Sequence, residues 1–203
     1  MKTVIRGVAV AALALASVHG FADQGTWLVR ARATQLSWDN AQTGAAKTLN
    51  VNAKDQLIPE VDISYFITKN IATELVLTYP QEVEIRAGSS SLGKVKALPP
   101  SILVQYHFTD FGVMRPYVGA GVNYSIFSSR KGLGGGTYAL ESSSLGYVAQ
   151  VGADYMLDKQ WGLNVDVKYI RMSTDVITNS DGAHVGELKL NPIAAALGVV
   201  YKF

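Results

Sequence analysis

The chain has 203 residues, of which 48% are hydrophobic and 17% charged, with 18 lysines and arginines against 16 aspartates and glutamates. Because the charges nearly balance, the chain lacks the excess of positive charge that nucleic-acid binding requires. The absence of cysteine excludes disulfides and thiolate metal sites. We therefore expect no nucleic-acid partner, no bound metal and no cofactor.

Residues 1–22 have the pattern of a secretory signal peptide. Lys2 and Arg6 precede a short apolar run, and small residues lead to an expected cleavage site after Ala22. The apolar run is well below the roughly 18 residues that a membrane-spanning helix needs. We expect an exported protein whose mature part, residues 23–203, is a single domain with 16 basic and 16 acidic residues.

Eight segments of the mature chain alternate between apolar and polar residues, which is the pattern of β-strands. They lie at 25–38, 56–68, 71–81, 95–108, 115–128, 143–157, 160–173 and 186–203. Strands two, four and six end in short turns, whereas long polar or glycine-rich stretches follow strands one, three, five and seven. This arrangement is typical of a bacterial outer-membrane barrel. The sequence predicts an all-β protein, an eight-stranded antiparallel transmembrane β-barrel with short periplasmic turns and long extracellular loops.

The faces of these strands favour a membrane barrel over a soluble sandwich. In the second strand Val61 and Ile63 alternate with Asp62 and Ser64, so one face is apolar while the other is polar or charged. The apolar faces of a sandwich would meet in a core, but a sandwich does not explain why aromatic residues gather at the strand ends. We interpret these aromatics as the two interfacial girdles of a membrane barrel.

Three stretches are similar to the OmpW family of outer-membrane proteins, which includes the AlkL-type importers of hydrophobic compounds. They are TKNIATELVLTYP at 68–80, LPPSILVQYHF at 98–108 and RPYVGAGVNYSIF at 115–127. The final YKF also resembles the C-terminal signal, here Tyr201 and Phe203, that barrel-insertion machinery recognises. The resemblance covers essentially the whole mature chain. It implies an integral, eight-stranded barrel in the outer membrane of a Gram-negative bacterium that takes up small hydrophobic molecules.

Side chains nearly fill an eight-stranded barrel, so the sequence excludes a wide aqueous pore. If the less apolar face is the inner one, a polar floor is expected from Arg30, Arg32, Asp62, Glu74, Gln105 and Asp166. Above it, toward the cell exterior, an apolar ligand funnel is expected from Leu36, Val76, Leu103, Val148, Ile170 and Met172. An alternative is that these apolar residues only fill the barrel. Lys168 in the funnel and Glu60 near its rim would favour guests with some polarity.

Three prolines lie toward the extracellular ends of the third and fourth strands, namely Pro80, Pro99 and Pro100. Because proline donates no backbone hydrogen bond, we expect them to open the ladder between these strands. The resemblance implies that hydrophobic guests leave sideways into the bilayer, and this seam would be their lateral exit. The alternative is that the prolines end both strands above the membrane.

Two other functions compete with transport. One is a structural or adhesive barrel whose loops bind partners. The other is an enzyme, since His184 lies near Ser180 and Asp181, although serine and aspartate are ordinary turn formers. We expect no enzyme. The expected partners are outer-membrane lipid and lipopolysaccharide, small hydrophobic substrates and the barrel-insertion machinery, while the substrate's identity and the oligomeric state stay open.

Overall fold

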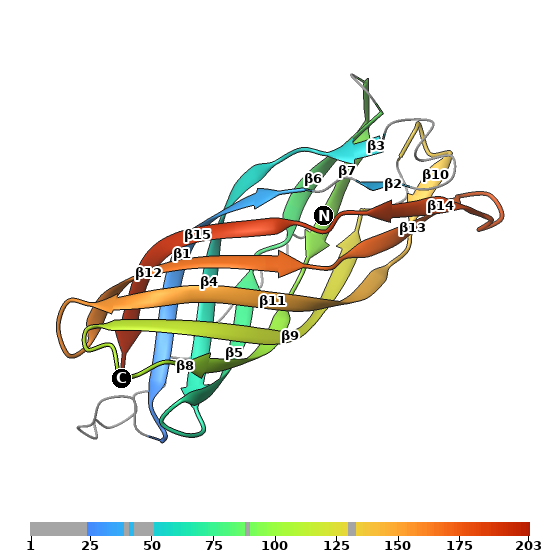
Figure 1. The fold of residues 1–203 in the computed structure, drawn as a ribbon. Helices are drawn as coiled ribbons and strands as arrows, with labels where there is room; N and C mark the ends of the chain where they lie inside the picture. The colour runs from blue at the N-terminus through green and yellow to red at the C-terminus, as the bar shows by residue number, and fades with distance from the viewer. Residues whose placement is uncertain (1–23, 39–40, 43–50, 88–89, 130–132) are drawn as a thin grey trace, which may run out of the picture.

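Eight strands close into a barrel in the computed structural model, which describes residues 24–38, 41–42, 51–87, 90–129 and 133–203. The barrel strands are β1 (Trp27–Ser37), β4 (Gln56–Phe66), β5 (Ile71–Thr78), β8 (Ser101–His107), β9 (Met114–Ser128), β11 (Ser143–Met156), β12 (Trp161–Ile170) and β15 (Ile193–Lys202). Each pairs antiparallel with the next, and β15 returns to pair with β1 (Figure 1). The predicted eight-stranded antiparallel barrel is confirmed, whereas the expected signal peptide lies outside the described residues.

Seven shorter strands extend the structure beyond one end of the barrel, where the sequence analysis expected mostly loops. One group continues the barrel sheet through β7 (Ser90–Leu98), β6 (Gln81–Ala87) and β3 (Val51–Ala53). The other is a separate sheet of β10 (Tyr138–Leu140), β13 (Ser173–Thr178), β14 (His184–Lys189) and β2 (Ala41–Gln42). Figure 1 shows both groups at the same end of the molecule, opposite the short turns.

Four of the predicted strands are each divided in two, which corrects their boundaries. The strand predicted at 95–108 is interrupted at residues 99–100 between β7 and β8, and the one at 186–203 is interrupted at residues 190–192 between β14 and β15. The strands predicted at 71–81 and 160–173 end at residues 78 and 170, and β6 and β13 each begin after a two-residue break. Prolines lie in the breaks at 79–80, 99–100 and 190–192, where a missing N–H group ends the ladder.

Short turns join the strands at the other end of the barrel. In the turn after β11, the carboxylate of Asp158 accepts hydrogen bonds from the backbone N–H groups of Trp161 (2.6 Å) and Gln160 (2.7 Å). These two hydrogen bonds hold the pKa of Asp158 below its ordinary value, because they favour the ionised carboxylate. By the rule that bacterial barrels keep their short turns in the periplasm, this end is periplasmic.

The outer face of the barrel is an apolar band with aromatic residues at both ends. Near the periplasmic end lie Trp27, Tyr65, Tyr106, Phe108, Trp161, Tyr201 and Phe203; near the extracellular end lie Tyr79, Tyr124, Tyr147 and Tyr169. These rings contact one another, as in the Trp161–Tyr201 and Tyr201–Phe203 pairs, whose centroids lie 4.7 Å apart. The described residues contain no helix that is long and apolar enough to cross a membrane.

The end of the chain belongs to this periplasmic girdle. The backbone N–H of Phe203 donates to the carbonyl of Trp27 (3.0 Å), which joins the last residue to the first barrel strand, and the Phe203 ring is 46% exposed. A bare aromatic in this place faces the lipid headgroups rather than water. The role of Tyr201 and Phe203 as an insertion signal stays a prediction.

The closed ladder generates a test of the fold. In detergent, unheated protein should migrate differently from boiled protein on a denaturing gel and should give a β-type circular dichroism spectrum, because the closed barrel resists unfolding by the detergent. A helical spectrum, or identical migration before and after boiling, would contradict the barrel.

Candidate functional site

The centre of the lumen is organised around Arg30 on β1, whose side chain is fully buried. Its Nε and Nη2 atoms donate to the two carboxylate oxygens of Asp154 at 3.0 and 2.7 Å. The Nη1 atom donates to the Ser64 hydroxyl (2.7 Å) and to the carboxylate of Glu74 (3.1 Å). Since the residues come from four different strands, this one guanidinium ties together much of the barrel wall.

Arg32, two residues along β1 and on the same face, makes a second centre. Its Nε atom lies 3.1 Å from the carboxylate of Glu60, and its Nη2 atom pairs with Asp62. The Nη1 atom donates to the side chain of Asn164 (3.0 Å) and lies 3.4 Å from the carboxylate of Asp166. Three carboxylates therefore surround one buried guanidinium.

Lys168 belongs to the same ionic network, although the sequence analysis placed it in the funnel. Its Nζ atom lies 2.8 Å from the Glu60 carboxylate and 2.9 Å from that of Asp166. Glu60, expected near the rim, is 6% exposed and contacts both Lys168 and Arg32. Because each charge is compensated by a partner, neither residue presents an open charge to a guest in the funnel.

Neutral side chains connect these ionic groups into a continuous layer. The amide of Gln150 donates to Glu74 (3.0 Å) and to Asp166 (2.8 Å), and the amide of Gln105 donates to Gln150 (3.0 Å). The structure thus brings together all six predicted floor residues, each of them buried: Arg30, Arg32, Asp62, Glu74, Gln105 and Asp166. They form one buried layer of charged and polar side chains inside the barrel.

Tyr117 is a central member of the floor that the sequence analysis did not identify. Its hydroxyl donates to Asp166 (2.8 Å), and its ring lies 5.0 Å from the Arg30 guanidinium. The residue paired with it on the neighbouring strand is Gly152, where an added Cβ would lie 2.5 Å from the phenol ring. The feature of the sequence that could have identified Tyr117 is the glycine at a lumen-facing position of the next strand, because it leaves room for a large side chain.

Five of the six predicted funnel residues lie in one buried apolar cluster: Val76, Leu103, Val148, Ile170 and Met172. The cluster continues out of the barrel into the extracellular strands through Val83, Ile85, Val95, Ala97, Phe127 and Leu140. The structure therefore differs from an open funnel. These side chains contact one another, and Leu103 and Val148 are each only 1% exposed.

The sixth predicted residue, Leu36, lies in a smaller cluster with Ile58 and Ala194. Trp38, which follows β1, packs against both this cluster and the main one. Its indole N–H donates to the carbonyl of Lys54 (3.1 Å), which fixes the ring beside the apolar interior. Leu36 is thus connected to the other funnel residues through one aromatic side chain.

The proline-containing region interrupts the pairing within one long hairpin, whose lower part is β5–β8 and whose upper part is β6–β7. The β5–β8 ladder stops at the Val76–Ser101 pair, and the β6–β7 ladder starts again at Gln81–Ala97. The residues between are unpaired in both ladders, and among them are Pro80, Pro99 and Pro100. Because paired strands continue above this seam, the prolines interrupt the sheet and do not mark its end.

Side chains from inside the barrel satisfy carbonyl groups at the seam. The Gln81 amide donates to the carbonyl of Tyr79 (2.7 Å), and the Asn123 amide donates to the carbonyls of Pro99 (3.1 Å) and Pro100 (3.2 Å). Neither side chain bridges the seam, because Gln81 bonds within its own segment and Asn123 belongs to β9, where the backbone N–H of Tyr124 also donates to the Pro100 carbonyl (3.1 Å). These hydrogen bonds satisfy carbonyl groups without replacing the missing pairing between residues 77–80 and 98–100.

The loop residues that suggested acyl-transfer chemistry have separate partners. The His184 ring lies 3.3 Å from the carboxylate of Asp175, whereas the Ser180 hydroxyl contacts Asp181 at 3.5 Å. Asp181 also accepts a hydrogen bond from Thr178, so it acts as a turn former. The structure does not bring this serine and histidine together as a nucleophile and its base.

The Arg30 site leads to a stability prediction. Changing Arg30 to Ala should lower the free energy of unfolding by about 3–5 kcal/mol, because Asp154 and Glu74 would remain buried without a counter-charge. Urea unfolding in lipid vesicles, followed by tryptophan fluorescence, measures the loss. The control is Lys94→Ala, which removes an exposed ion pair with Glu82 and should change stability little. Equal stability of both variants would contradict the assigned role of Arg30.

The comparisons with known proteins agree with this architecture. The model of the OmpW family matches residues 23–203. The chain is 41% identical to an uncharacterized outer-membrane protein, y4mB, of Sinorhizobium fredii, over 87% of this chain and 80% of that protein. It is 34% identical to outer membrane protein W of Vibrio cholerae over the full length of both, and 31% identical to outer membrane protein AlkL of Ectopseudomonas oleovorans over 81% and 74%.

Solved structures show the same fold. OprG of Pseudomonas aeruginosa superposes with a TM-score of 0.72 at 22% identity, covering 89% of this chain and 97% of that one. The structure of AlkL in lipid bilayers gives a TM-score of 0.71 at 24% identity, covering 93% and 94%. With an apolar outer band, two aromatic girdles and a family model that spans the whole barrel, this chain belongs to the OmpW family of integral outer-membrane proteins.

Proposed function

We propose that this protein takes up small hydrophobic molecules across the outer membrane. The observation that carries the proposal is the apolar cluster around Leu103 and Val148, which runs from the extracellular strands down to the polar floor. Removing apolar surface from water yields roughly 25 cal/mol per Å², so such a path attracts a hydrophobic guest. Membership of the family that includes the AlkL-type importers supports the same function.

The guest enters from the extracellular end, where the cluster lies between two sheets. Val83 and Val95 come from the β6–β7 hairpin, and Leu140 comes from the separate sheet. Because the side chains are packed, a guest replaces contacts that they make with one another. Entry therefore involves separation of these sheets, whose apolar inner faces the guest then covers.

The floor prevents further movement toward the periplasm. An apolar chain that passed Arg30 or Arg32 would break buried ion pairs and leave polar groups unsatisfied, at about 1–3 kcal/mol for each group. The proline seam offers a sideways route instead. Val76 forms the last β5–β8 pair below the seam and also lies in the apolar cluster, so the cluster borders the opening. Guests then leave into the bilayer between β5 and β8.

A structural or adhesive barrel is the second candidate function. The observation in its favour is the packing of the predicted funnel, since Leu103 and Met172 are almost fully buried by neighbouring side chains. A side chain that only fills the barrel has the same surroundings. The two candidates differ in what a polar substitution at these positions does to uptake.

A substitution in the apolar cluster distinguishes the transport function from the structural function. Leu103→Asp should abolish most uptake of a small hydrophobe such as a radiolabelled alkanol into whole cells, because the buried acid attracts water into the path. Leu103→Met conserves the apolar character and serves as the control with near-normal uptake. Gel mobility before and after heating verifies that both variants insert. Normal uptake by a correctly folded Leu103→Asp barrel would favour the structural role.

The exit is tested by restoring N–H donors to the seam. With Pro80, Pro99 and Pro100 changed together to Val or Thr, amide hydrogen exchange in β5 and β8 should slow while hydrophobe uptake falls. Pro116→Val is the matched control, since Pro116 lies in the β9–β11 ladder near the periplasmic end, away from the seam. Undiminished uptake through a newly protected seam would eliminate this route.

A further inference from the structure

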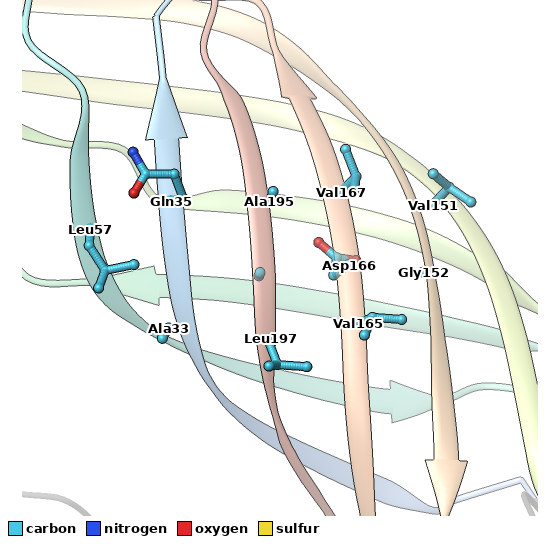
Figure 2. A pocket seen from close by; sticks show the side chains of 11 residues that line it. Ala33, Gln35, Leu57, Val151, Gly152, Val165, Asp166, Val167, Ala195 and Leu197 are labelled. Carbon is cyan, nitrogen blue, oxygen red and sulfur yellow. The ribbon is translucent and has the colours of Figure 1, made fainter.

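A groove of about 500 Å³ lies on the outer wall of the barrel, over β11, β12, β15, β1 and β4. Figure 2 shows Ala33 and Ala195 along its middle, with Leu57 and Gln35 on one side and Val167 and Leu197 on the other. All six residues are exposed. Gly152, Asp166 and Ala196, at the lumen-facing positions between them, also belong to its lining. The groove opens on the outer wall and plays no part in the proposed transport path.

The strand register explains the hollow. Ala195 pairs with Gln35 on one side and with Val167 on the other, while Ala33 pairs with Leu197. Short side chains at the middle of these rows leave space that the longer neighbours enclose. The depression is thus built into the ladder itself and does not depend on a loop.

The position of the groove identifies what covers it. Gln35 and Leu57 lie close to the extracellular ends of β1 and β4, and Ala195 lies close to the extracellular end of β15. The groove belongs to the apolar band between the girdles, so the surrounding medium is the outer leaflet of the membrane. Its walls contact the acyl chains of outer-leaflet lipid.

Two polar side chains near the groove complement a lipid headgroup. The exposed Gln35 amide stands in an otherwise apolar wall, bonded only to the carbonyl of Leu36 at 3.3 Å among its described neighbours. Arg171 follows β12 four residues beyond Val167, so it lies within about 14 Å of it along the chain. Its exposed guanidinium stacks over the Tyr147 ring (5.9 Å) and pairs with no carboxylate among the described residues.

We propose that this groove binds one acyl chain of a phosphorylated outer-leaflet lipid, the lipid A part of lipopolysaccharide. The chain lies over Ala33 and Ala195, Gln35 hydrogen-bonds to the polar linkage at its upper end, and Arg171 contacts a phosphate. An unpaired cation at the membrane surface favours an anionic lipid over a neutral one.

A second copy of this chain fits the groove less well than a lipid does. Two convex barrels touch along a narrow strip, whereas a stable protein interface buries about 1,200–2,000 Å². A flexible acyl chain follows a concave groove along its whole length. The cation at the upper edge also needs an anionic partner, and the apolar outer face of another barrel supplies none.

The test uses the full mature barrel, refolded without lipid in detergent micelles and titrated with bisphosphorylated lipid A. Native mass spectrometry counts the bound lipids. We expect one lipid per barrel, and at least about tenfold weaker binding by Ala195→Leu, which fills the groove. Ala120→Leu is the matched control, because Ala120 also faces outward but lies on β9. It should bind lipid A as the unmodified barrel does.

The proposed contact between Arg171 and a lipid phosphate is tested by comparing phosphorylated with dephosphorylated lipid A. Arg171→Gln should weaken binding of bisphosphorylated lipid A about fivefold and leave binding of dephosphorylated lipid A unchanged. Equal lipid binding by Ala195→Leu and Ala120→Leu would overturn the groove as the site. Barrel dimers that disappear only in Ala195→Leu would assign the groove to a second copy and also overturn the proposal. Heat-dependent gel mobility verifies that every variant is folded, so a folding defect cannot be mistaken for lost binding.

Discussion

The pairing of Arg30 and Arg32 with buried carboxylates is the interaction on which the rest of this structure depends. Both guanidiniums point into a lumen that water does not reach, and Asp154 and Asp62 supply the negative charge that makes their burial tolerable. The neighbouring strand β15 must then present small residues to the lumen. At Gly198 an added Cβ would lie 2.1 Å from the carbonyl oxygen of Ala31 and 2.7 Å from the Arg32 side chain. The close approach of the two backbones and the bulk of Arg32 therefore both require a glycine there.

This charged layer divides the barrel into two compartments with different properties. Below it the lumen narrows to a small apolar cluster that includes Phe66 and Val200, and above it the large cluster rises into the extracellular sheets. An apolar molecule gains by entering the upper compartment and loses by crossing the layer. Under the proposed function, the break in the β5–β8 ladder matters because it lies beside this upper compartment.

The outer wall of the barrel, like its interior, has two distinct regions, the proline seam and the lipid-facing groove. The proline seam lies between β5 and β8, whereas the lipid-facing groove is centred on β15 and extends from β11 to β4, the strand next to β5. A lipid bound at the groove would cover the wall that carries Arg30 and Arg32.

The two-residue period of the strands determined much of this protein from the sequence alone. Alternation assigns every residue to the lumen or to the lipid, because successive side chains of a strand point to opposite faces. It placed Arg30, Asp62 and Asp166 in one layer without any knowledge of their contacts. The count of alternating segments predicted the number of barrel strands, and the lengths of the connections between them predicted the end at which the turns lie.

Only the tertiary structure decided which of these residues meet. Lys168 and Glu60 are 108 positions apart and contact each other because the barrel closes, a constraint that no local pattern contains. Tyr117 reaches the floor because Gly152 on the next strand leaves room for its ring. The divided strands, the packing of the predicted funnel and the groove beside Ala195 likewise arise from strand pairing and register. Periodicity specifies the face of a side chain, whereas its partners depend on how distant strands are aligned.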